Sequence, residues 1–149
     1  MIYIYDIESF INVFCVTFKR VDNGKIIRYV IYYNKQNNEN SINELDALFS
    51  FLNTNKNKWL VGYNSKFFDN QILNYLYKNY DLFTILDLEE ILSNLHNFVL
   101  SIINENVTEY KYRLPFKSVD LMRVGNVEKK SLKLVAVNLN WPVIQDLPY

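Results

Sequence analysis

The sequence predicts an α/β fold, in which a mixed sheet is flanked by helices. Three β-rich runs open the chain, and segments with helical periodicity then alternate with short apolar runs, which is the order expected of such a sheet. Half of the 149 residues are hydrophobic, and Gly and Pro number only three each. This composition indicates one compact domain, residues 1–149, and not a linker or a disordered tail.

The overall charge does not favour a particular partner. Sixteen basic and sixteen acidic side chains give a formal net charge of zero, so any contact with nucleic acid has to be local. The lone Cys15 lies in an apolar run, which is typical of a buried thiol in a reducing compartment. No apolar stretch reaches the roughly 18–20 residues that span a bilayer. We therefore expect a cytoplasmic protein, in a bacterial or phage-infected cell, with no membrane contact.

The first three elements are predicted to be strands in a meander, Ile2 to Tyr5, Val13 to Phe18 and Ile26 to Tyr33. Asp22-Asn23-Gly24 supplies a turn that tolerates the left-handed conformation between the last two. After a polar loop, Ser41 and Glu44 form a capping-box pattern that predicts a helix through about Asn53. Its apolar face would contain Ile42, Leu45, Leu48, Phe49 and Leu52.

The rest of the chain alternates strands and helices. Trp59 to Tyr63 is predicted to be a short buried strand, and a helix follows Asp69. A long amphipathic helix is expected from about Leu86 to Asn104, then a strand from Lys117 to Val124. Ser131 would cap a final helix that ends near Leu139. The inward positions are Ile72, Leu73, Leu76 and Tyr80 in the first of these helices and Leu132, Val135, Ala136 and Leu139 in the last.

Acidic residues at two places have a spacing that suits a metal site. Asp6 and Glu8 are two positions apart in the first strand, so both carboxylates point to one face, roughly 6–7 Å apart along the backbone. Asp69 stands at the junction between a strand and a helix. An unpaired carboxylate among apolar neighbours is unfavourable, and we interpret the three acids as metal ligands. Asp87 and Glu89 repeat the spacing, but a helix would splay them apart.

Several carboxylates at one place are what a two-metal nuclease requires. Two divalent cations held roughly 4 Å apart repel each other, so their charge must be neutralised together. One ion generates hydroxide, and the other stabilises the leaving oxygen. Hard oxygen ligands suit Mg²⁺ or Mn²⁺, and these are the cofactors that we expect.

The same residues resemble a known family, the DEDD-type 3′–5′ exonucleases of the ribonuclease H-like fold, especially the proofreading domains of phage DNA polymerases. Tyr5-Asp6-Ile7-Glu8 is similar to the first motif of that family, and the segment from Gly62-Tyr63-Asn64 to Phe68-Asp69 is similar to the second. The segments 117–122 and 129–132 resemble the family's last strand and following helix. The resemblance implies hydrolysis of single-stranded DNA from its 3′ end, with a polymerase domain or replication protein as a further partner.

The resemblance also implies a role for each site residue. Asp6 would bridge both metals, Glu8 would hold the hydroxide-generating ion, and Asp69 would hold the second through water. Asn64 and Phe68 would grip the terminal nucleotides, with Lys66 nearby, although core packing is an equal alternative for Phe68. Further basic residues could line a groove for a single strand or form a solvated face: Lys111, Arg113, Lys117, Arg123, Lys129, Lys130 and Lys133.

One family motif has no counterpart in the sequence. A Tyr or His followed four positions later by the last Asp is expected beyond Tyr149, so the domain is expected to be C-terminally incomplete relative to the family. His96 is followed four positions later by Leu100 and not by an Asp. Tyr77 and Asp81 have the required spacing, but they come directly after the second motif, which is the wrong order for the family. Asp120 could compensate if the end of its strand faced Asp6, but we expect a solvated or hydrogen-bonded strand residue and do not assign it to the site. Activity would then be weak or absent, and the alternative is a non-catalytic module that binds nucleic acid or protein, such as a phage-encoded inhibitor.

Overall fold

A computed structural model of the chain describes residues 1–54, 57–104 and 116–123. The strands are β1 (Ile2–Ser9), β2 (Val13–Arg20), β3 (Ile26–Tyr32), β4 (Ile42–Asn43), β5 (Trp59–Gly62) and β6 (Lys117–Asp120). The helices are α1 (Leu45–Asn53), α2 (Asp69–Lys78), α3 (Tyr80–Phe83) and α4 (Leu88–Asn104), with 3₁₀ turns at Asn38–Asn40 and Leu121–Arg123. The predicted helix after Ser131 lies outside the described residues.

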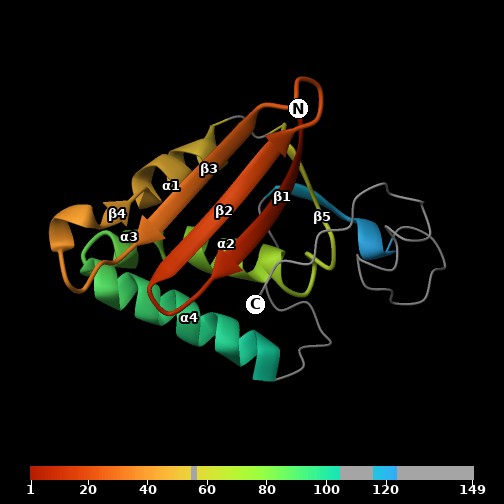
Figure 1. Ribbon diagram of the computed structural model, residues 1–149. Coiled ribbons are helices and arrows are strands. Elements are labelled where there is room, and N and C mark those ends of the chain that lie inside the picture. Colours follow the sequence, from red (N-terminus) through yellow and green to blue (C-terminus); the bar gives the residue numbers. More distant parts are fainter. Residues whose placement is uncertain (55–56, 105–115, 124–149) are drawn as a thin grey trace, which may run out of the picture.

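The six strands form one mixed sheet in the order β4-β3-β2-β1-β5-β6 (Figure 1). Strands β1 to β4 pair antiparallel, whereas β5 runs parallel to β1 and β6 runs parallel to β5. The α/β class and the opening meander are thereby confirmed. Gly24 has φ +70°, so the turn between β2 and β3 uses the left-handed conformation that was predicted there.

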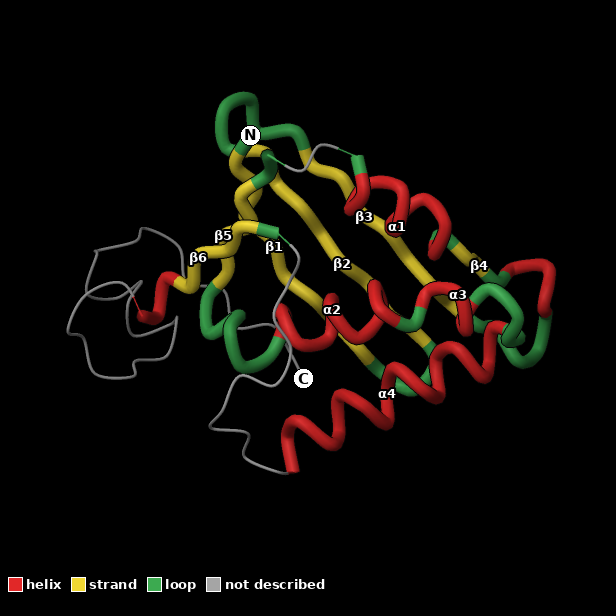
Figure 2. The backbone as a smooth tube through the Cα atoms, turned by 180° about the vertical axis from the view of Figure 1, so that it is seen from behind, coloured by secondary structure: helices red, strands yellow, loops and turns green. Residues whose placement is uncertain are grey.

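Helices α1 to α4 lie on one face of the sheet (Figure 2). Tyr3, Tyr5 and Ile7 of β1 are buried beneath them together with Phe14, Val16 and Phe18 of β2. Alternate residues point the other way, as the period of a strand requires. No helix or loop among the described residues covers that second side, which we call the open face. The open face consists of Ile2, Ile4, Asp6, Glu8, Cys15, Thr17, Lys19, Ile26, Arg28, Trp59, Val61, Lys117 and Val119.

The capping box expected at Ser41 and Glu44 is wrong. The Ser41 hydroxyl accepts a hydrogen bond from the Asn34 N–H at 2.9 Å, and the Glu44 carboxylate accepts one from the Val30 N–H at 2.7 Å. Both side chains are therefore used in tertiary contacts, and α1 begins only at Leu45. Residues 42–43 pair with β3 instead of forming the first turn of the helix.

Two further expectations are corrected. Tyr80 does not continue α2, because the helix ends at Lys78 and Tyr80 begins α3. Cys15 is a free thiol, but it is only half-buried because it lies on the open face and not in the core. Within the described part of the chain, no helix is both long and apolar enough to cross a membrane.

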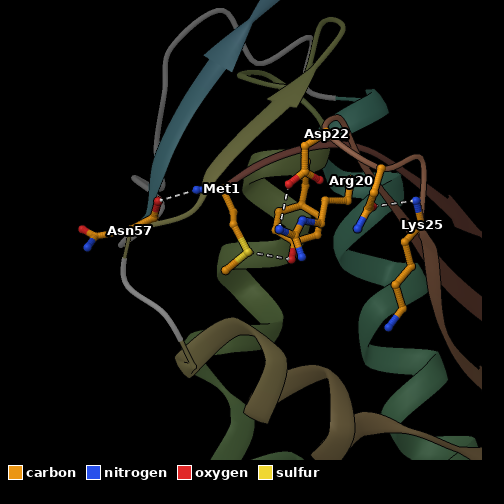
Figure 3. Close-up of polar contacts among 7 residues, drawn as sticks. Met1, Arg20, Asp22, Lys25 and Asn57 are labelled. Atoms are coloured by element: carbon orange, nitrogen blue, oxygen red, sulfur yellow. Dashed lines mark hydrogen bonds and ion pairs between the residues drawn. The ribbon is translucent and has the colours of Figure 1, made fainter.

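Polar contacts fix the start of β1 beside β5 (Figure 3). The terminal ammonium of Met1 donates to the Asn57 carbonyl at 3.5 Å, and the Trp59 N–H donates to the Met1 carbonyl at 2.8 Å. Close by, Arg20 and Asp22 form an ion pair at 2.7 Å. The two contacts of Met1 hold the parallel strands β1 and β5 together at this end, whereas their pairing stops at Ile4 and Val61.

Candidate metal centre

The candidate site begins where β1 loses its parallel neighbour. Strand β5 pairs with β1 only from Ile2 to Ile4, so the edge of β1 from Asp6 onward faces the start of α2. Asp6 and Glu8 both lie on the open face and are exposed, as their spacing predicts. The edge therefore leaves backbone groups of β1 available to residues outside the sheet.

Asp69, the first residue of α2, comes to this edge from the other side. Its side chain is only 5% exposed, and its Oδ1 atom has no hydrogen-bond partner within the described part of the chain. A buried acceptor without a partner is rare in proteins, because its lost hydration is not compensated. Asp69 is thus held in a position that a ligand would satisfy.

The carboxylates of Asp6 and Asp69 both lie within electrostatic range of the backbone N–H of Ile7. This N–H interacts with both carboxylates and favours the charged form of each. Burial nevertheless raises the pKa of Asp69 to about 7, and the charge of Asp6 adds to the shift. Asp6 is exposed, but the atoms packed around its carboxyl partly desolvate it and raise its pKa above the usual value. A buried carboxylate whose pKa is raised further by a neighbouring carboxylate is a group that a cation would stabilise.

Glu8 extends the acidic group along β1. Partial burial raises the pKa of its carboxyl, and the charge of Asp6 contributes to the same shift. However, no group of three or more His, Cys, Asp or Glu side chains among the described residues lies close enough to hold a metal ion. The structure brings Asp6 and Asp69 together, and it places Glu8 beside Asp6 without gathering all three acids around one point.

Asp120 has a structural position next to this group. One carboxylate oxygen accepts the Lys66 N–H at 3.0 Å, and the other accepts the Met122 N–H at 3.1 Å. The prediction of a hydrogen-bonded strand Asp is confirmed. Its charge adds slightly to the raised pKa of Asp69, so it lies within electrostatic range of the site. Asp120 ties the end of β6 to the loop that carries the second motif.

That loop turns tightly between β5 and α2. Gly62 lies so close to Ser65 that an added Cβ would come within 2.5 Å of the Ser65 Cβ. Asn64 has φ +54°, a conformation that Asn tolerates better than most residues, and its side chain is exposed. Lys66 is half-buried. Phe68 packs its ring against the core, which agrees with the core-packing alternative for this residue. The turn delivers Asp69 to the edge of β1.

A hydrogen-bonded chain of side chains fixes α2 against two strands. The Tyr5 hydroxyl donates to Asn70 Oδ1, and Asn70 Nδ2 donates to the Ser118 hydroxyl at 3.2 Å. Asn70 is 1% exposed and follows Asp69 directly. Sequence analysis did not identify this residue, because a polar residue in the first turn of a helix is usual and carries no separate signal.

The remaining predicted residues lie elsewhere or outside the described residues. His96 lies in α4, and the Tyr77 hydroxyl donates to Asn53 at 2.6 Å, so this Tyr serves the packing of α2 on α1. Of the basic residues, Lys111, Arg113, Lys129, Lys130 and Lys133 lie outside the described residues, and Arg123 is the last residue of the 3₁₀ turn after β6. Lys117 extends from the open face over the ring of Trp59, 5.3 Å from its centre.

A cavity of about 560 Å³ opens near the β1–β2 turn. Tyr32, Tyr33, Lys35 and Gln36 line one side of it, and Glu89 and Ser93 of α4 line another. The three predicted acids are not among its lining residues. The cavity is therefore distinct from the meeting point of Asp6 and Asp69.

Comparison with known proteins adds no further assignment. No family model matches this chain, and no curated protein or solved structure matches it. The class that fold and site define is an α/β protein with a six-stranded mixed sheet and a pair of acids at the edge of its first strand.

Proposed function

We propose that this chain is a metal-dependent 3′–5′ exonuclease domain of the DEDD type that shortens single-stranded DNA ends, as proofreading domains do. The observation that carries the proposal is the buried Asp69, 5% exposed and with its Oδ1 unpartnered among the described residues, within electrostatic range of Asp6. The two residues come from the two motifs that resemble the family, one on β1 and one at the start of α2. The meander followed by two parallel strands supports a ribonuclease H-like sheet.

The donor set fits a hard divalent cation such as Mg²⁺ or Mn²⁺. Asp6 and Asp69 would hold the ion, and Glu8 would be the next carboxylate available on the same strand. When bound, such an ion activates water and stabilises the charge of the leaving oxygen. Asn64 and Lys66 belong to the loop that delivers Asp69, so they would contact the terminal nucleotides, whereas Phe68 packs against the core.

Digestion of a 5′-labelled single strand in Mn²⁺ tests the proposal. The parent chain should produce a ladder that shortens from the 3′ end, and a chelator should abolish it. Asp6→Asn and Asp69→Asn should remove the activity, whereas Asp81→Asn, an exposed acid of α3, should retain it. If the Asp6 variant digests DNA as fast as the parent, the site is assigned wrongly.

A second candidate is a non-catalytic binding module. It is favoured by the observation that no three acidic side chains gather at one point among the described residues. Such a module would bind a nucleic acid or a protein with an affinity that survives Asp6→Ala, and it would show no metal-dependent turnover.

Substrates with and without a 2′-hydroxyl distinguish a ribonucleolytic relative from a DNA exonuclease.

A further inference from the structure

The open face carries a continuous apolar patch. Cross-strand register places Ile2 beside Trp59 and Ile4 beside Val61, and Val119 follows in the same row. Ile2 and Ile4 are each 48% exposed, Trp59 is 42% exposed and Ile26 is 59% exposed. Large apolar side chains gathered on one exposed surface of a protein mark an interaction site more often than scattered ones do.

Cations are interleaved with this patch. Lys19 pairs with Ile4 on one side and with Ile26 on the other, so it stands between two apolar residues in one row. Lys117 pairs with Trp59, and its ammonium lies 5.3 Å from the centre of the indole ring. Arg28 stands one row further, where its guanidinium donates to the Thr17 hydroxyl at 3.3 Å. From β6 to β3 this array spans about 19 Å, four times the strand spacing of roughly 4.8 Å.

This pattern discriminates between possible occupants. An apolar occupant, such as a helix or a second copy of the chain, would have to desolvate Lys19 and Lys117 without supplying partners for them, which is unfavourable. A polyanion with aromatic faces satisfies both kinds of group, because phosphates contact the cations while bases stack on Trp59. The surface chemistry therefore matches a single-stranded nucleic acid.

We propose that the open face binds single-stranded nucleic acid, with a base stacked on Trp59 and phosphates at Lys19, Lys117 and Arg28. The inference goes beyond the proposed nuclease, because it concerns binding alone and does not require cleavage. Asp6 and Glu8 lie on the same face, next to the cationic rows, so a strand bound there would pass the candidate metal centre.

Binding of a short fluorescent oligothymidylate by the full chain, measured by anisotropy in the presence of a chelator, tests the inference. Lys19→Glu and Trp59→Ser should each weaken binding roughly tenfold, since loss of one stacked base or one phosphate contact has about that effect. Trp59→Phe should restore most of the affinity, because it keeps an aromatic face. Matched controls on the helix-covered side, Lys78→Glu and Leu82→Ser, should bind like the parent.

The outcomes separate this inference from the proposed function. The inference would be overturned if the control variants lost as much affinity as Lys19→Glu and Trp59→Ser, or if the parent did not bind. It would also be overturned if a Trp59 variant changed the oligomeric state instead of the affinity. Circular dichroism melts verify that every variant is folded. The chelator blocks cleavage, so this assay measures binding alone. A chain that binds through the open face here but digests nothing in the separate Mn²⁺ assay would support this inference and contradict the exonuclease.

Discussion

Asp6 and Asp69 interact with the same backbone N–H, that of Ile7, although one belongs to the first strand and the other to the start of α2. Their mutual repulsion and the burial of Asp69 make the fully ionised pair unfavourable in the absence of a cation. A protein without use for this arrangement would gain stability by replacing one acid. The predictions below follow from this pair and from the contacts that hold it in place.

Asp69→Asn should stabilise the protein at alkaline pH. The pKa of Asp69 in the folded protein, about 7, lies above its ordinary value of 3.8, so ionisation of Asp69 opposes folding as the pH rises between the two values. The resulting loss in the free energy of unfolding is absent below the lower pKa and amounts to roughly 4 kcal/mol above the higher pKa. Urea unfolding near pH 4 and near pH 8 measures it. If Asp69→Asn changed the free energy of unfolding equally at both pH values, the raised pKa of Asp69 would be contradicted. Asp81→Asn is the control.

Gly62→Ala should destabilise the turn that delivers Asp69. The new Cβ would come within 2.5 Å of the Ser65 Cβ and 2.7 Å of its hydroxyl, so the loop has to move, at about 1–3 kcal/mol. Ser65→Gly removes both contacting atoms and should recover much of the loss in the double variant. Gly24→Ala is the contrast, because its neighbourhood is empty and its φ of +70° alone makes Ala unfavourable. Ser65→Gly should not rescue Gly24→Ala in denaturant unfolding.

Asp120→Ala should loosen the loop without removing any acid proposed to bind metal. It deprives the Lys66 and Met122 N–H groups of their acceptors, each bond to a charged acceptor being worth roughly 1.5–3 kcal/mol. Hydrogen exchange at these two amides should accelerate more than exchange in β2. Unchanged exchange at Lys66 would show that Asp120 does not hold the loop.

Tyr5→Phe should reveal the coupling between β1 and α2. The change leaves the buried Asn70 Oδ1 without its donor, which costs about 1–3 kcal/mol. In a double-mutant cycle with Asn70→Ala, the two losses should fall short of additivity by at least about 0.5 kcal/mol. Strict additivity would mean that Tyr5 and Asn70 do not interact.

Much of the fold could be predicted because the alternation of apolar and polar residues along the strands agrees with the side of the sheet that each residue occupies. The alternation in β1 places Tyr3, Tyr5 and Ile7 in the core and Asp6 and Glu8 opposite them, and the structure has this arrangement. The predicted start of α1 was wrong because Glu44 accepts a hydrogen bond from the Val30 N–H of β3. The residues around the helix terminus do not indicate such a tertiary partner in the sequence.

The candidate site could be predicted only in part. The acids are found by residue type and spacing, whereas the Ile7 N–H at their centre is a backbone group that every non-proline residue has. The register that ends β5 pairing at Ile4 exposes this N–H, and that register depends on packing across the sheet. Asn70 and Ser118 were missed for the same reason, since their roles exist only once α2 and β6 are side by side.

Calorimetric titration of Mn²⁺ into the chain, in two buffers of different ionisation enthalpy, tests the metal centre most directly. A pKa of about 7 means that about half a proton must leave Asp69 when a cation binds at neutral pH. We predict saturable binding with that proton release, and loss of binding in both Asp6→Asn and Asp69→Asn. Binding that is unchanged in either variant, or no binding by the parent, would contradict a metal centre built on these two carboxylates.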